Sequence, residues 1–129
     1  MFNLIYRDGT RENAGRYETL DKVSAATAFE CGQAVELSGG KATEAVGAKK
    51  PYGIVAADSP AGEAVVVVLK VEHDMVFSVP SGVSGLVKGD ICALAAGGVL
   101  GAKGETDGAT IVNVCGAAEA GDRVEVRFE

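Results

Sequence analysis

The single histidine of the chain is the first candidate for chemistry, because histidine is the side chain most often used for proton transfer near neutral pH. His73 is followed directly by Asp74. The segment around them alternates like a strand, however, and neighbouring strand residues point to opposite faces. One histidine also excludes metal sites that need several. We therefore expect His73 to be a structural or interfacial residue.

Two serine-containing motifs fail at specific positions. Ser84 lies between two glycines, but the nucleophile elbow Gly-x-Ser-x-Gly requires glycine where Leu86 stands. The segment 38–41, Ser-Gly-Gly-Lys, contains the Gly-Lys pair of a phosphate-binding loop. Such a loop requires serine or threonine at Ala42 and glycine at Val35. The sequence predicts no catalytic residue, and we expect the protein not to be an enzyme.

Potential metal ligands are scattered. Cys31, Cys92 and Cys115 are odd in number, widely spaced, and fit neither a CxxC motif nor a zinc-ligand spacing. The acidic pair Glu72 and Asp74 lacks the ligand series of a calcium-binding loop. We predict reduced thiols, most of them buried, with no metal site and no cofactor.

Composition and charge exclude further classes. The chain has 129 residues, a net charge of −6, 5% aromatic residues and no tryptophan. An acidic surface repels a phosphate backbone, and few aromatic rings are present for stacking on bases, so we expect no nucleic-acid partner. No apolar run approaches the roughly 20 residues of a membrane span. Residues 1–6 are too short for a signal peptide, so we expect synthesis in the cytoplasm.

The elements that position these residues are predicted to be strands. In the stretch 51–78, a short apolar strand over 53–56 is followed by turn residues over 58–62 and a long apolar strand over 64–69. Four consecutive valines crowd a helix but suit a pleated strand. Because all six residues over 64–69 are apolar, the pattern predicts a strand covered on both faces. The predicted fold class is all-β.

This pattern occurs twice along the chain. The repeats are Gly62–Val67 with Gly121–Val126, and Gly32–Leu37 with Gly89–Leu94, the latter two followed by Gly39-Gly40 and Gly97-Gly98. We interpret residues 18–129 as one β domain built from half-units 18–72 and 75–129, forming one small barrel or a two-sheet sandwich. The alternative is that short β-meanders in a sequence rich in glycine and alanine are similar by chance.

Residues 1–17 lie outside the repeat. They carry three arginines against two acidic residues, whereas the rest of the chain is strongly acidic. One interpretation is an N-terminal arm that orders on binding or adds a strand to a neighbouring sheet. The other is a strand of the same domain followed by a loop.

Several segments resemble the head decoration (capsid cement) proteins of tailed phages. Four segments carry this resemblance. They are the Gly-Ile-Val-Ala strand at 53–56, the strand over 64–69 with its continuation to Phe77, the Val-Lys-Gly-Asp turn sequence at 87–90, and the closing strand over 120–128. It implies a β-barrel or β-tulip domain without catalytic residues. The apparent internal duplication departs from a minimal decoration protein.

The resemblance also implies a role and partners. The protein would bind the exterior of an expanded capsid, sit at local three-fold positions as a homotrimer, and lock neighbouring major capsid proteins together in the virion. The expected capsid contacts lie in the arm, with apolar anchors and arginines that meet acidic capsid loops: Phe2, Ile5, Tyr6, Arg7, Arg11 and Arg16. Deletion of residues 1–17 is then expected to leave a folded domain that no longer binds capsids.

Three other functions remain open on sequence alone. One is a tail-tube, fibre or other head component of the same virion. A second is a small ligand-binding β-barrel or an accessory subunit of a bacterial complex, which an interior polar cluster facing a cavity would favour. The third is an enzyme, against which the failed motifs argue.

Overall fold

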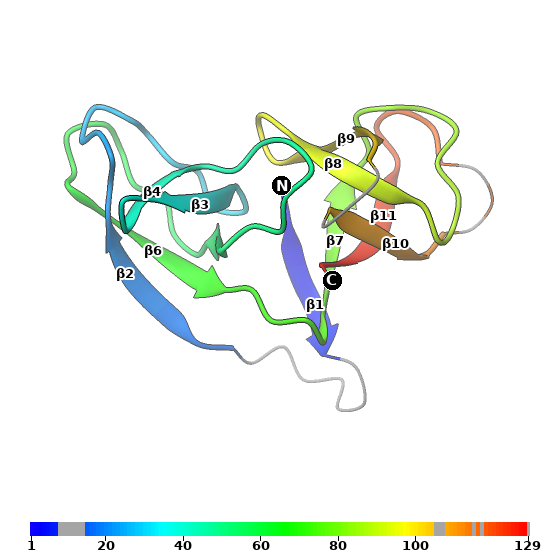
Figure 1. The fold of residues 1–129 in the computed structure, drawn as a ribbon, viewed down its shortest axis with the longest axis horizontal. Coiled ribbons are helices and arrows are strands. Elements are labelled where there is room, and N and C mark those ends of the chain that lie inside the picture. The colour runs from blue at the N-terminus through cyan, green and yellow to red at the C-terminus, as the bar shows by residue number, and fades with distance from the viewer. Residues whose placement is uncertain (8–14, 105–107, 115, 117, 129) are drawn as a thin grey trace.

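The computed structural model describes residues 1–7, 15–104, 108–114, 116 and 118–128, and the described residues form strands, turns and loops without a helix. The predicted all-β fold class is confirmed. Figure 1 shows two lobes with β1 between them. The strands are β1 (Asn3–Arg7), β2 (Tyr17–Asp21), β3 (Ala34–Ser38), β4 (Lys41–Glu44), β5 (Gly53–Val55), β6 (Val65–Lys70), β7 (Met75–Pro80), β8 (Ile91–Ala95), β9 (Val99–Lys103), β10 (Ala109–Asn113) and β11 (Arg123–Phe128).

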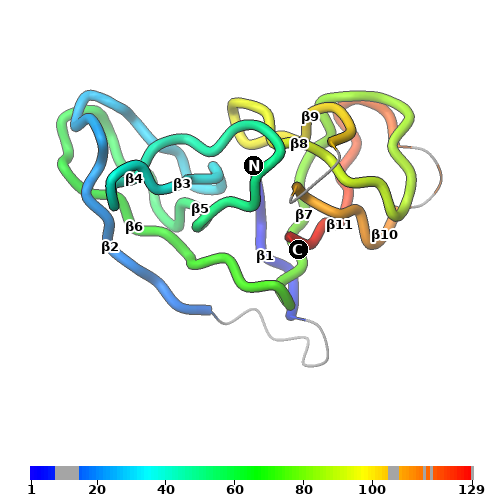
Figure 2. Tube along the Cα trace, viewed as in Figure 1, coloured from blue at the N-terminus to red at the C-terminus, as the bar shows by residue number. Residues whose placement is uncertain are grey.

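Each lobe contains one antiparallel sheet. The five-stranded sheet has the order β2-β6-β5-β3-β4, and the six-stranded sheet has the order β1-β7-β11-β10-β8-β9. Both sheets curl, as the tube in Figure 2 shows. In the described residues, an isolated parallel bridge joins Lys22, after β2, to Ala42 of β4, and another joins Ser81, after β7, to Leu100 of β9. The two-sheet alternative is therefore the one observed, and neither sheet closes into a barrel.

The two half-units have the same strand order. Strands β2 to β6 of the first correspond one by one to β7 to β11 of the second, and β1 is the strand added to the second. Turn geometry agrees, since Gly62 and Gly121 have φ values of 97° and 93°. Such positive φ angles are costly for residues with a side chain, which explains glycine at both turns. The boundary between the half-units falls between Lys70 and Met75.

The structure matches β6 to β11 with an offset that is one residue smaller than the offset between the repeated sequence motifs. Val66 and Val68 are buried, as are Val124 and Val126 of β11. The structural offset is therefore 58 along these strands, whereas the turn glycines are 59 apart. The first half-unit therefore has one extra residue between Gly62 and Val65. A shift of one residue moves side chains to the opposite face of a strand, so it changes which residues correspond on the outer face.

The expectation that the strand over 64–69 is covered on both faces is wrong. Val66 and Val68 pack inside the first lobe, but Val65 is 40% exposed and Val67 is 36% exposed. Strand side chains alternate between faces, and only one face of β6 is covered at this end. Apolar composition alone could not reveal this, because valine occupies both faces.

The main core joins the two lobes. Phe2 packs against Phe77 and Phe128, with ring centroids 6.4 and 5.4 Å apart. Ile54 and Leu69 reach the same cluster from the five-stranded sheet. A smaller cluster fills the first lobe, and its members are Phe29, Val35, Ala42, Val55, Val66 and Val68. The shared cluster fixes the lobes relative to each other and places Phe2 at their junction.

Lys22 is 5% exposed, yet its ammonium group is well paired. Nζ donates to the carbonyl oxygens of Thr27 at 2.8 Å, Pro60 at 3.1 Å and Ser59 at 3.3 Å. Ammonium carries three donors, so these bonds satisfy it completely. The lysine thereby ties β2 to two loops of the first lobe.

We expect Lys22→Met to lower the free energy of unfolding by about 2 kcal/mol, because it leaves three carbonyl oxygens without their charged donor. Urea denaturation measures this change. Lys41→Met is the matched control, since Lys41 is an exposed lysine of β4. Its effect should stay within about 0.5 kcal/mol. Equal unfolding midpoints for the two variants would contradict the structural role of Lys22.

Candidate functional site

The catalytic candidates of the sequence do not come together. His73 is exposed in the connection between β6 and β7 rather than on a strand, which corrects the expected position. Ser84 Oγ accepts the backbone N–H of Ala120 at 3.2 Å, a loop contact. Residues 38–41 form the turn of the β3–β4 hairpin. In the described part of the chain, no three His, Cys, Asp or Glu side chains are grouped to hold a metal.

The N-terminal residues expected to contact a capsid have different environments. Phe2 is 2% exposed and belongs to the core, so it is not available as a surface anchor. Ile5 is 37% exposed, Tyr6 is half-buried and Arg16 is exposed. Arg11 lies outside the described residues. Residues 3–7 are strand β1, paired with β7. Of the two interpretations of the N-terminal segment, the strand of the same domain is the one observed.

Arg7 is held by two carboxylates instead of facing outward. Its Nε and Nη2 donate to Asp74 at 2.9 and 2.7 Å, and Nη2 also donates to Glu72 at 2.6 Å. Arg16 adds a longer contact to Glu72 at 3.4 Å. Hydrogen bonds from Arg7 lower the pKa of both Glu72 and Asp74. This network joins the end of β1 to the connection between the half-units.

These lowered pKa values predict loss of stability in acid. Ionised Glu72 and Asp74 contribute fully above their ordinary pKa values, and their contribution disappears as pH falls through the lower folded-state values. The melting temperature should therefore fall between about pH 5 and pH 3, and it should fall less in Arg7→Gln. Thermal unfolding across this range measures the difference. If the melting temperatures of both proteins fell equally with pH, the stabilising role of this network would be contradicted.

The outer face of β2 and β6 is uncovered and carries exposed apolar side chains beside Thr19 and Asp21. Cross-strand partners share one face of a sheet. Here the pairs are Tyr17 with Leu69, Thr19 with Val67, and Asp21 with Val65. Tyr17 is 63% exposed, whereas Leu69 is buried where the face reaches the other lobe. We call the exposed side chains Tyr17, Thr19, Val65 and Val67 the β2–β6 face.

The second half-unit provides an internal comparison for this face. At the positions of Val65 and Val67, β11 carries Arg123 and Glu125. Both half-units have the same strand order, so the fold does not require valine there. Exposed valines on a strand are costly for solubility and promote association. The apolar β2–β6 face is therefore a property of the first half-unit that folding alone does not explain.

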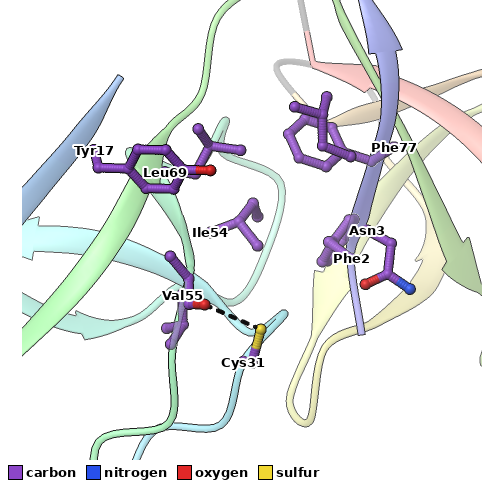
Figure 3. Close-up of a pocket in the computed structure, with 10 residues that line it drawn as sticks. Phe2, Asn3, Tyr17, Cys31, Ile54, Val55, Leu69 and Phe77 are labelled. Carbon is purple, nitrogen blue, oxygen red and sulfur yellow. Dashed lines mark hydrogen bonds between the residues drawn. The ribbon is translucent and has the colours of Figure 1, made fainter. Parts of the chain in front are cut away.

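A cleft of about 150 Å³ continues this face inward between the lobes. In Figure 3, Phe2 and Asn3 lie on one side and Ile54, Leu69 and Tyr17 on the other. The full lining comprises Phe2, Asn3, Leu4, Tyr17, Cys31, Ile54, Val55, Ala56, Leu69 and Phe77. The cleft has an apolar floor and no charged side chain in its lining, so it suits an apolar group rather than an ion.

The described cysteines are both free and differ in environment. Cys31 is exposed at the cleft, and its Sγ donates to the Ala56 carbonyl at 3.4 Å. Cys92 is buried, and burial raises the pKa of its thiol to about 11. Cys115 lies outside the described residues. The expectation of mostly buried thiols therefore holds for Cys92 and not for Cys31.

The fold and the site define an all-β protein of two equivalent half-units with an apolar surface on one of them. Comparison with known families, characterised proteins and solved structures finds no match to this chain. No helix in the described residues is long and apolar enough to cross a membrane.

Sequence reasoning missed Tyr17, Val65 and Val67. The signal that could have found them is the contrast between the valine run of 65–68 and the alternating charges of 123–127.

Proposed function

We propose that this protein is a non-enzymatic structural component of a tailed-phage virion that binds the exterior of the expanded capsid. Its partner is the major capsid protein, whose neighbouring copies it holds together. The sequence resemblance to decoration proteins supports this proposal.

The observation that carries the proposal is the uncovered β2–β6 face. A tyrosine beside two valines supplies the aromatic and aliphatic contacts that dominate protein interfaces. The charged equivalent on the second half-unit would remain in solvent and keep the particle surface hydrophilic. This division of roles suits a protein with one face on a shell and the other in water.

The proposed assembly is a homo-oligomer, with the trimer favoured. An expanded capsid presents many identical sites, and linked copies gain avidity without new contacts. Light scattering of the purified protein measures its mass. A single species at three times the chain mass supports the trimer, and a monomer at all concentrations contradicts it.

Co-sedimentation with expanded capsid shells that lack the protein tests the function. Unexpanded shells of the same capsid protein are the control. We expect saturable binding to expanded shells only, with a copy number that matches the shell lattice. Absence of binding to either shell would contradict the proposal.

The ligand-binding alternative has less support. Pockets for small ligands usually enclose about 300–1,000 Å³. The inter-lobe cleft has about 150 Å³. A second, open hollow lined by Glu36, Leu37, Lys49, Lys50, Pro51 and Tyr52 has about 380 Å³ and lies on the surface. We therefore favour a protein partner.

A further inference from the structure

Strand β1 has a free edge beside the inter-lobe cleft. It is the terminal strand of its sheet, and among the strands that the structure describes it pairs with β7 alone. Among the described residues, no backbone bond is made by its other edge beyond the bond from Phe2 N–H to the Gly32 carbonyl at 2.8 Å. Asn3 and Leu4 of this strand line the cleft. Unpaired N–H and C=O groups at a sheet edge can accept an added strand.

The size of the cleft limits what enters it. A cleft of about 150 Å³, lined by aliphatic and aromatic side chains together with Asn3 and Cys31, accommodates one benzene-sized group. It is too small for a second strand or a whole element. One leucine, methionine or phenylalanine side chain would fill it and contact Leu4, Ile54 and Leu69.

Three exposed carboxylates lie next to residues of the cleft or of the β2–β6 face. Glu30 precedes Cys31 at the cleft, and Asp58 Oδ1 accepts the N–H of Cys31 at 2.7 Å. Asp21 is paired across the strands with Val65. None of these three carboxylates has a basic partner within the described residues. A partner complementary to this surface carries basic residues beside its apolar one.

We propose that the cleft receives one large apolar side chain from an extended segment of the major capsid protein, which adds as a short strand to the free edge of β1. Basic residues of the same segment meet Glu30, Asp58 and Asp21. This inference rests on the proposed function and names the site at which the capsid is held. The bulge between Leu4 and Tyr6 limits pairing to the first residues of β1.

The test fills the cleft from within. Cys31→Trp places an indole at the cleft, and Cys31→Ser is the matched control of nearly unchanged size. Both variants and the wild type are sedimented with expanded shells. We expect Cys31→Ser to bind like the wild type and Cys31→Trp to bind at least about tenfold more weakly, as expected when an interface anchor loses its pocket. Thermal unfolding verifies that both variants are folded.

Hydrogen exchange on the wild type gives a second measurement that needs no variant. Binding to shells should slow amide exchange over residues 2–5, because an added strand protects the edge of β1. Equal binding by all three proteins, or unchanged exchange over residues 2–5 in bound protein, would overturn the inference and leave the proposed function intact. Absence of wild-type binding would overturn both.

Discussion

Replacing Phe2 with alanine is expected to lower the free energy of unfolding by about 3–5 kcal/mol, as for other buried phenylalanines. The ring is 2% exposed and contacts Phe77 and Phe128 at the junction of the lobes. Its removal leaves a cavity that two rigid sheets cannot close. Urea denaturation measures the change. Ile5→Ala is the control on the same strand, because Ile5 is 37% exposed and its replacement should cost about 1 kcal/mol or less.

This prediction separates the two interpretations of the N-terminal segment. If residues 1–17 were a detachable arm, Phe2→Ala would leave stability unchanged and only weaken binding. With β1 inside the sheet, deletion of residues 1–17 removes a strand and a core aromatic. The truncated protein should therefore unfold at a much lower urea concentration, or fail to fold. A truncated protein as stable as the full chain would instead support the interpretation of residues 1–17 as a detachable arm.

The second large effect, a loss of shell binding, is expected when the exposed valines of β6 are replaced by the charged residues of β11. The double variant Val65→Arg/Val67→Glu gives β6 the residues found at the equivalent positions of β11. The second half-unit tolerates them, so we expect stability to change by about 1 kcal/mol or less. Binding to expanded shells should fall at least about 30-fold, because two charges would be buried at an apolar interface. Co-sedimentation at several protein concentrations measures the affinity.

The control alters the corresponding face of the second half-unit. Glu125→Val changes a strand residue at the position equivalent to Val67 and should leave shell binding unchanged. If it weakens binding as much as the double variant does, both half-units contact the shell. If the double variant binds normally, the β2–β6 face is not the contact surface.

The sequence predicted the strands and their repetition because these depend on local chemistry. The valine run of β6 and the turn glycines Gly62 and Gly121 specify conformation within a few residues, and the structure has them where expected. The one-residue difference between the repeats was not predictable from aligned glycines. It arises from one extra residue between Gly62 and Val65, which lengthens the turn without changing the pattern of residue types.

The site was harder to predict, because it depends on distant packing. Phe2 meets Phe77 and Phe128 only after both sheets have formed, so its apolar side chain looked like a surface anchor. Arg7 finds Glu72 and Asp74 in the same way. Val65 and Val67 resemble their buried neighbours in type, and only the packing inside the first lobe decides which valines of β6 are buried and which stay uncovered.

Electron cryo-microscopy of expanded shells saturated with the protein tests the central claim most directly. We expect ordered density on the shell exterior at lattice-related positions, with the β2–β6 face against the capsid protein and Arg123 and Glu125 toward solvent. A reconstruction in which the protein is absent, or in which the β2–β6 face points away from the shell, would contradict the account.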